Sequence, residues 1–283
     1  MLKVERYFRP GTVKEALEVL TANKSKILSG GTDLVLDLQK KEMPGMIVDI
    51  GSLNELQQIR ETRDKVILGS GVTFTQVEIS PVTKKYCSAL SEAAGLVGSP
   101  QIRNQGTVGG NIANASPAAD TVPAIVAMDG EVLLASLRGE RLVKVTDLLK
   151  GIGKTDLAAD ELILEISFNK IANFRSTFVK LGRRNALAIS RISAALGVSV
   201  NEEGTIYEAR AALGSVAPNP FRSKVMENVL LDKNINQGIP EDVIQAAGDD
   251  VADRLGTRAS APYKREAVKG VVRQALENLF SKR

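Results

Sequence analysis

Two short glycine-rich stretches, Ser29-Gly30-Gly31-Thr32-Asp33-Leu34 and Gly106-Thr107-Val108-Gly109-Gly110-Asn111, carry most of the information in this chain. Each places paired glycines beside a threonine, and the first follows the short apolar run Ile27-Leu28. Paired glycines allow successive backbone N–H groups to turn toward one point, because no Cβ stands in the way. Such a nest of N–H groups binds anionic oxygens, so the two stretches together predict a site for the two halves of a pyrophosphate.

A simpler interpretation is that each stretch is a tight turn that needs a positive φ. Both stretches consist of small and polar residues with nothing bulky, which a turn alone does not require. Neither matches G-x-G-x-x-G, and the chain contains no G-x-x-x-x-G-K-[ST] phosphate loop. A nucleotide bound here is therefore expected to be held differently from the nucleotides of Rossmann folds and P-loop proteins.

The composition excludes several kinds of chemistry. The chain of 283 residues has one cysteine, Cys87, and no histidine. Intrachain disulfides, cysteine-ligated iron–sulfur or zinc centres, and Ser-His-Asp or Cys-His catalysis are therefore ruled out. An enzyme of this composition is expected to depend on a bound cofactor, with no catalytic residue and no metal site of its own. Cys87 itself is expected to be a buried thiol within a helix.

Charge and hydropathy narrow the class of protein further. The hydrophobic content of 43% and the charged content of 25% are typical of a soluble globular protein. The net charge of +4 is spread along the chain and there is no Trp, so no nucleic-acid partner is expected. The first ten residues lack an apolar signal core and no run of 18 apolar residues occurs. These features predict a cytoplasmic protein with no membrane partner.

Periodicity and capping residues predict an α+β chain in three units, 1–55, 56–170 and 171–283. Capping boxes are expected at Thr12-Val13-Lys14-Glu15 and Thr73-Phe74-Thr75-Gln76, and Asn23 and Lys24 are expected to end the first helix. Further helices are predicted at 34–38, 83–95, 223–231, 240–255 and 263–282, and one from Ser116-Pro117 to Met128. Strands are predicted at 46–50, 66–72, 131–136, 141–145, 162–168, 176–182, 189–200 and 205–215.

With these motifs in place, the chain resembles the FAD-binding medium subunit of the molybdenum hydroxylases. That family includes xanthine dehydrogenases, nicotinate dehydrogenase and carbon monoxide dehydrogenase. The resemblance covers essentially the whole chain and is most specific around the second glycine-rich stretch. The matching segments are Phe8-Arg9-Pro10, 28–34, 99–113, 115–120, 160–166, 178–184 and Pro262-Tyr263-Lys264-Arg265.

The resemblance implies a PCMH-type FAD-binding fold in two subdomains, followed by a C-terminal domain of antiparallel sheet and helices. It implies non-covalent FAD between the first two domains, with 28–35 as the pyrophosphate loop and 107–111 as a second loop. The residues it assigns to the cofactor site are Leu28, Ser29, Gly30, Gly31, Thr32, Asp33, Leu34, Val35, Val97, Thr107, Val108, Gly109, Gly110, Asn111, Asp120, Ile163 and Lys180.

Three of these residues also have an ordinary structural interpretation. The resemblance places Asp120 at the FAD hydroxyls, but the residue also suits the first turn of a helix. Ile163 corresponds to a residue that contacts the flavin or adenine, or it is a strand core residue. Lys180 corresponds to a basic residue near the isoalloxazine ring, or it is an exposed strand lysine. At Val97 some relatives carry an aromatic residue that packs on the flavin.

The function that the resemblance implies is an electron relay. A molybdopterin-binding large subunit and a [2Fe-2S] small subunit are the expected partners, in a heterotrimer that passes electrons through FAD to an acceptor such as NAD. The resemblance places the molybdopterin and the clusters in the partner subunits, and the single cysteine of this chain could not hold a cluster. Three alternatives stay open: a free-standing flavin oxidoreductase of the same fold, a cell-wall precursor reductase, and a structural subunit that has lost FAD.

Overall fold

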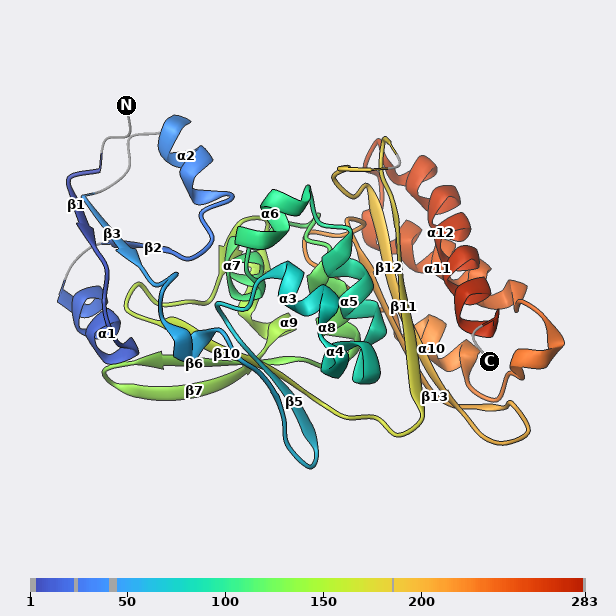
Figure 1. The fold of residues 1–283 in the computed structure, drawn as a ribbon. Helices are drawn as coiled ribbons and strands as arrows, with labels where there is room; N and C mark the ends of the chain where they lie inside the picture. The colour runs from blue at the N-terminus through green and yellow to red at the C-terminus, as the bar shows by residue number, and fades with distance from the viewer. Residues whose placement is uncertain (1–3, 23–24, 41–44, 185, 282–283) are drawn as a thin grey trace.

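Three main sheets follow one another along the chain. The computed structural model describes residues 4–22, 25–40, 45–184 and 186–281. Figure 1 shows the sheets in chain order: a small blue unit, a central unit from cyan to green, and a yellow sheet backed by orange and red helices. Helices and strands are mixed throughout, which confirms the α+β class. The exact boundaries at 55 and 170 stay predictions.

The first unit is a parallel sheet of three strands in the order β1–β3–β2. Parallel neighbours need crossover connections, and the two helices of this unit supply them. One half of the predicted capping box at Thr12 is present, because the N–H of Glu15 donates to Thr12 Oγ1 at 3.1 Å, whereas Glu15 Oε2 accepts from the N–H of Gly11 at 2.8 Å. The predicted helix end at Asn23 and Lys24 lies outside the described residues. The elements are β1 (Arg6–Phe8), α1 (Val13–Ala22), β2 (Ser25–Leu28), α2 (Leu34–Lys40), β3 (Met46–Asp49) and η1 (Asn54–Leu56).

The second unit is an antiparallel sheet in the order β4–β5–β10–β6–β7, with short helices on one face. The capping box at Thr73 is confirmed, since Thr73 and Gln76 exchange both of its hydrogen bonds. The strands are β4 (Ile59–Glu61), β5 (Lys65–Gly69), β6 (Glu131–Ser136), β7 (Gly139–Lys144) and β10 (Leu162–Asn169), and β8 (Leu149–Gly151) and β9 (Lys154–Thr155) form a separate ribbon. The helices are α3 (Phe74–Ile79), α4 (Pro81–Tyr86), α5 (Ser88–Gly95), α6 (Pro100–Gln105), α7 (Val108–Asn114), α8 (Thr121–Ala127) and α9 (Val145–Leu148).

The predicted helix over 83–95 is wrong as a single element. It is split at Cys87, whose φ of −156° and ψ of 73° are not helical. The break lets α5 begin against β11, where Ser88 Oγ and the N–H of Ala89 bond to Ser176. The prediction that Cys87 is a buried thiol is confirmed, although the residue joins two helices instead of lying within one.

The helix predicted from Ser116 to Met128 is wrong at its start. Ser116 Oγ accepts a bond from the N–H of Ala118 at 3.3 Å and holds a local turn. The helix α8 begins at Thr121 instead. Asp120 stands before it without capping it, because the carboxylate is bonded to residues of the third unit.

The third unit confirms the predicted antiparallel meander, in the order β11–β12–β13–β14. One face of the sheet packs on α10 and α12, with α11 lying against those two helices, and the other face packs on α5 and α8 of the second unit. The sheet therefore connects the hydrophobic core of the second unit to the hydrophobic core of the third unit (Figure 1). The elements are β11 (Phe174–Leu181), β12 (Ile192–Val200), β13 (Ile206–Gly214), β14 (Phe221–Arg222), α10 (Lys224–Leu230), η2 (Ile235–Gln237), α11 (Glu241–Leu255) and α12 (Ala261–Ser281).

Candidate cofactor site

The fold brings the two glycine-rich stretches together, although they are far apart in sequence. Ser29 Oγ lies 3.1 Å from Thr107 Oγ1. A Cβ on Gly30 would lie 1.8 Å from the carbonyl oxygen of Gln105, so the first stretch meets the second at a distance that only glycine allows. Gln105 was not predicted as part of the site. It contributes a backbone carbonyl to the contact, and no pattern in the neighbouring residues indicates that another segment packs against that carbonyl.

The first stretch has backbone donors that the protein itself does not use. Within the described parts of the chain, the N–H groups of residues 30–34 have no protein acceptor. Gly31 has a φ of +71°, a conformation that glycine adopts freely and that turns neighbouring N–H groups toward one side. Residues 29–32 are half-buried, so these donors lie in a recess instead of on a freely hydrated loop. Such donors suit an anionic ligand.

The second stretch has a different structure from the one predicted. Its residues from Val108 onward form the first turn of α7, and neither Gly109 nor Gly110 has a positive φ. The N–H groups of Val108 and Gly109 donate to the carbonyls of Val72 and Ser70, at 3.0 and 2.9 Å. The N–H of Gly110 donates to Thr107 Oγ1 at 3.1 Å. For this stretch, the predicted nest of N–H groups and the simpler interpretation as a turn with a positive φ are therefore both wrong.

Glycine is nevertheless required at position 109. A Cβ there would lie 2.5 Å from the Cβ of Ser70 and 2.6 Å from its carbonyl oxygen. The Ser70 hydroxyl is buried and has no hydrogen-bond partner among the described residues. This orphaned hydroxyl beside the second stretch is a donor that sequence reasoning missed, since Ser70 falls inside a predicted strand.

Asp120 and Lys180 form a buried ion pair, 2.6 Å between Oδ2 and Nζ, with side chains 7% and 10% exposed. Lys180 Nζ also donates to the carbonyls of Leu96 and Ala188. Ser190 Oγ donates to the other carboxylate oxygen of Asp120 at 2.5 Å. Burial raises the pKa of Asp120, and the Lys180 ammonium and the Ser190 hydroxyl oppose that rise. The interpretation of Lys180 as an exposed strand lysine is therefore wrong.

The remaining predicted residues lie in the second unit. Ile163 is 5% exposed on β10, opposite Leu134, in the position of a core residue. Val97 is half-buried against the same core. The Asn111 side chain accepts a bond from Thr121 Oγ1 at 2.7 Å, which ties the second stretch to α8. Thus the structure joins 28–35 to 107–111 and joins Asp120 to Lys180.

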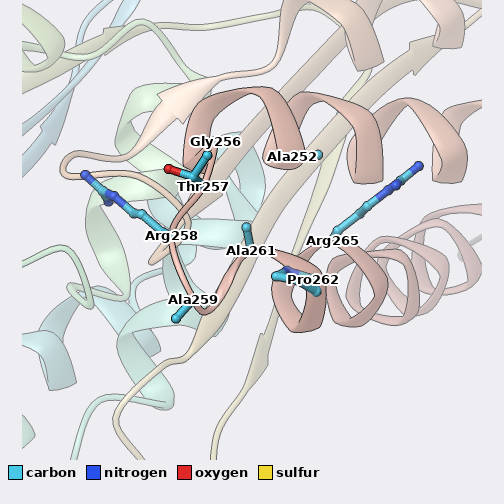
Figure 2. Close-up of a pocket in the computed structure, with 8 residues that line it drawn as sticks. All are labelled: Ala252, Gly256, Thr257, Arg258, Ala259, Ala261, Pro262 and Arg265. Atoms are coloured by element: carbon cyan, nitrogen blue, oxygen red, sulfur yellow. The ribbon is translucent and has the colours of Figure 1, made fainter.

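A pocket elsewhere does not belong to this arrangement. A cavity of about 370 Å³ lies where α11 ends and α12 begins, and it includes Gly256 and Thr257. Figure 2 shows the side chains of Arg258 and Arg265 at this cavity pointing in different directions. Its elements belong to the third unit and include neither glycine-rich stretch.

Comparison with known proteins identifies the family. Residues 2–169 match the FAD binding domain in molybdopterin dehydrogenase, and residues 177–279 match the CO dehydrogenase flavoprotein C-terminal domain. The chain belongs to the flavoprotein subunits of the molybdopterin dehydrogenases. It is therefore an oxidoreductase subunit, and its cofactor is FAD.

Individual relatives match over nearly their full length. The nicotinate dehydrogenase FAD-subunit of Eubacterium barkeri is 36% identical over 99% of this chain and 97% of that protein. A xanthine dehydrogenase FAD-binding subunit from Escherichia coli is 31% identical over 98% and 96%. Among solved structures, carbon monoxide dehydrogenase from Hydrogenophaga pseudoflava matches with a TM-score of 0.88 and 28% identity, over 98% of this chain and 97% of that chain. These matches confirm the predicted fold.

The described residues fit the cofactor of this family. FAD contains a pyrophosphate, and the unused N–H groups of residues 30–34 are donors of the kind that phosphate oxygens accept. The orphaned Ser70 hydroxyl is a further donor beside the second stretch.

Among the helices of the described ranges, none is long and apolar enough to cross a bilayer.

Proposed function

We propose that FAD lies between the first and second units, with its pyrophosphate on the N–H groups of residues 30–34. The observation that carries this proposal is the run of consecutive donors without an acceptor in the described parts of the chain. Hydrogen bonds from such donors to a charged group are worth about 1.5–3 kcal/mol each. Residues 30–34 then contribute the donors, while Leu28 and Val35 bound the turn, since a Cβ on Gly31 would lie 3.0 and 3.2 Å from their side chains.

The second stretch has another part in the proposed site. Its first-turn N–H groups are used within the protein, so residues 107–111 contribute shape and rigidity more than donors. Thr107 joins this rigid element to Ser29 on the opposite side. The buried pair of Asp120 and Lys180 lies where the second and third units meet, and we assign that end of the site to the flavin. Val97 is half-buried and follows Leu96, whose carbonyl accepts a hydrogen bond from Lys180, so we assign Val97 an apolar contact at the same end.

The cofactor is held without a covalent bond in this proposal. The chain has no histidine. Burial raises the pKa of the Cys87 thiol to about 12, so no thiolate is available there at neutral pH. Treatment with acid should therefore release a yellow chromophore into the supernatant. Flavin that stays on the precipitated protein would contradict this part of the proposal.

In the assembled enzyme, this subunit relays electrons. Bound FAD supplies redox chemistry that can take electrons from an iron–sulfur partner and deliver them to an acceptor such as NAD. The partners we propose are a molybdopterin-binding large subunit and a [2Fe-2S] small subunit. The family match and the near-complete coverage of subunits of named dehydrogenases support this assembly. A cytoplasmic location stays a prediction from sequence.

Two measurements test the proposal. Native purification from the source cells should yield this chain with two other chains, one containing molybdenum and one containing iron and sulfide. The purified chain should absorb near 450 nm. A full-length, folded chain that is colourless and takes up no added FAD would favour a structural subunit. A yellow, flavin-containing chain that oxidises substrate at full rate without any partner would favour a free-standing flavin oxidoreductase.

A further inference from the structure

The central sheet ends in an edge strand, β7, whose outward backbone groups have no partner among the described residues. Within the described ranges, strand β7 pairs only with β6, in a register that sets Glu131 opposite Lys144. The N–H of Val145 donates to the carbonyl of Gly130, which continues that register. Since such bonds alternate along an antiparallel ladder, the backbone groups of Glu140, Leu142 and Lys144 point away from β6.

Other sheet edges of the molecule are closed or very short. On β11, the outward N–H of Ser176 donates to Ser88 Oγ, and that of Phe178 donates to Glu92 Oε2. Strand β4, at the other edge of the central sheet, has three residues. In β7, the N–H groups of Glu140, Leu142 and Lys144 have no acceptor among the residues that the structure describes. The central sheet is therefore open at β7, where an added strand has six residues to follow.

The side chains on this edge are self-complementary. Glu140, Leu142 and Lys144 are all exposed and lie on one face of β7, and Leu142 is 52% exposed. Neither Glu140 nor Lys144 has an ion-pair partner in the described parts of the chain. The two charges are opposite in sign and equally spaced on either side of Leu142. An edge strand with exposed charges of one sign would repel a second copy of itself. The opposite charges of Glu140 and Lys144 do not cause such repulsion.

We propose that β7 is a docking edge for a second copy of this chain, paired antiparallel about a two-fold axis at Leu142. Each Leu142 then exchanges backbone hydrogen bonds with its counterpart in the other copy. The N–H of Lys144 in one copy donates to the carbonyl of Glu140 in the other. Glu140 of each chain stands directly opposite Lys144 of its partner, the cross-strand position in which opposite charges attract. The contact is isologous, so it closes after two copies.

A cysteine at the axis tests the pairing in the full-length chain. Across a hydrogen-bonded pair, the Cα atoms lie about 5.5 Å apart, which a disulfide can span. Cys87 is buried, so Leu142→Cys carries the one reactive thiol. The matched control is Val225→Cys on α10, which is equally exposed at 52%. Under mild oxidant, Leu142→Cys should form a covalent dimer at least about tenfold faster than the control. Equal rates would mean that β7 is a protected edge and would overturn the proposal.

Charge reversal tests the register. In the Leu142→Cys chain, Lys144→Glu sets like charges opposite each other at both ends of the pairing, and dimer formation should slow about tenfold. Adding Glu140→Lys restores opposite charges and should restore the rate. No slowing, or slowing without rescue, would overturn the antiparallel register. FAD content should stay unchanged in all variants, because β7 carries none of the proposed cofactor residues. Failure here would therefore be distinguishable from failure of the proposed function.

Discussion

Residues 29–34 and residues 106–111 carry the same paired glycines beside a threonine, but their backbones have opposite roles. In the first, the N–H groups of residues 30–34 have no acceptor among the residues that the structure describes, and Gly31 has a positive φ. In the second, the N–H groups of residues 108–110 all donate within the protein, and the backbone is helical. Glycine provides donors and an unusual conformation in one segment, and close packing in the other.

The comparison shows that a glycine pair does not by itself specify an anion site. What distinguishes the two segments is the set of acceptors that the rest of the fold brings to them. The carbonyls of Ser70 and Val72 accept from the second segment, whereas no described carbonyl accepts from the N–H groups of residues 30–34 in the first. The predictions below test this division of roles by the affinity for FAD, from the largest expected loss to the smallest.

Gly30→Ala should have the largest effect. The new Cβ would lie 1.8 Å from the carbonyl oxygen of Gln105, a backbone atom that cannot move aside alone. The two segments must then separate. We expect a loss of about 1–3 kcal/mol in the free energy of unfolding and FAD binding weakened about a hundredfold or more. Urea unfolding and flavin fluorescence titration measure the two quantities.

The matched control for this variant is Gly270→Ala in α12. A Cβ at Gly270 meets nothing within 4 Å, and alanine is favoured over glycine in a helix by about 0.5–1 kcal/mol. The control should be at least as stable as the parent chain, with full FAD affinity. If Gly30→Ala also bound FAD normally, close approach of the two segments would not be needed for the site.

Gly31→Ala should weaken FAD binding about tenfold while the chain stays folded. An L-residue with a φ of +71° costs about 1–2 kcal/mol, and relief of that strain turns the neighbouring N–H groups away from their common direction. Gly153→Ala is the control, because Gly153 has a similar φ of +64° and open space around it. It should lose similar stability but no FAD affinity. Gly31→Asn, which tolerates this conformation better, should recover part of the affinity.

The features of the fold that depend on neighbouring residues could be predicted from the sequence. The capping box at Thr73 forms as predicted and the one at Thr12 forms in part, with the Glu15 carboxylate accepting from Gly11, because such caps need only residues that are neighbours in the chain. Thr107 also caps a helix, and a threonine three residues before Gly110 is a signal that could have revealed α7. That helix was missed because two glycines in its first turn disfavour a helix when judged locally.

Long-range contacts account for the other errors. The helix break at Cys87 is favoured by hydrogen bonds to Ser176 on β11, about ninety residues later, and no Gly or Pro marks it. The late start of α8 follows from the bonding of Asp120 to Lys180 and Ser190. No short sequence pattern near Cys87 or Asp120 indicates these distant hydrogen-bond partners. The contact between Gly30 and Gln105 is of the same kind, because it exists only after the first two units have packed.

Thr107→Val should have a smaller effect on FAD binding than either glycine variant. The change keeps the shape of the side chain but removes the oxygen that accepts from Gly110 and contacts Ser29. Loss of the helix cap is worth about 1 kcal/mol of stability. Because the donors of residues 30–34 are untouched, FAD affinity should fall only about two- to fivefold. Thr107→Ser restores the hydroxyl and should restore both quantities. A hundredfold loss with Thr107→Val would mean that Thr107 itself binds the cofactor.

Gly110→Ala should be the mildest change, and it tests the division of roles most directly. Gly110 is exposed and helical, and its new Cβ would meet just the Oγ1 atom of Thr107, at 2.9 Å. A hydroxyl can rotate, and alanine suits a helix, so stability should change by less than about 0.5 kcal/mol. The N–H of Gly110 is already bonded to Thr107, so no donor to the pyrophosphate is lost. FAD affinity should therefore fall less than about threefold. If it falls as far as in Gly31→Ala while the melting temperature is unchanged, the second segment touches the pyrophosphate directly, and the two segments share one role after all.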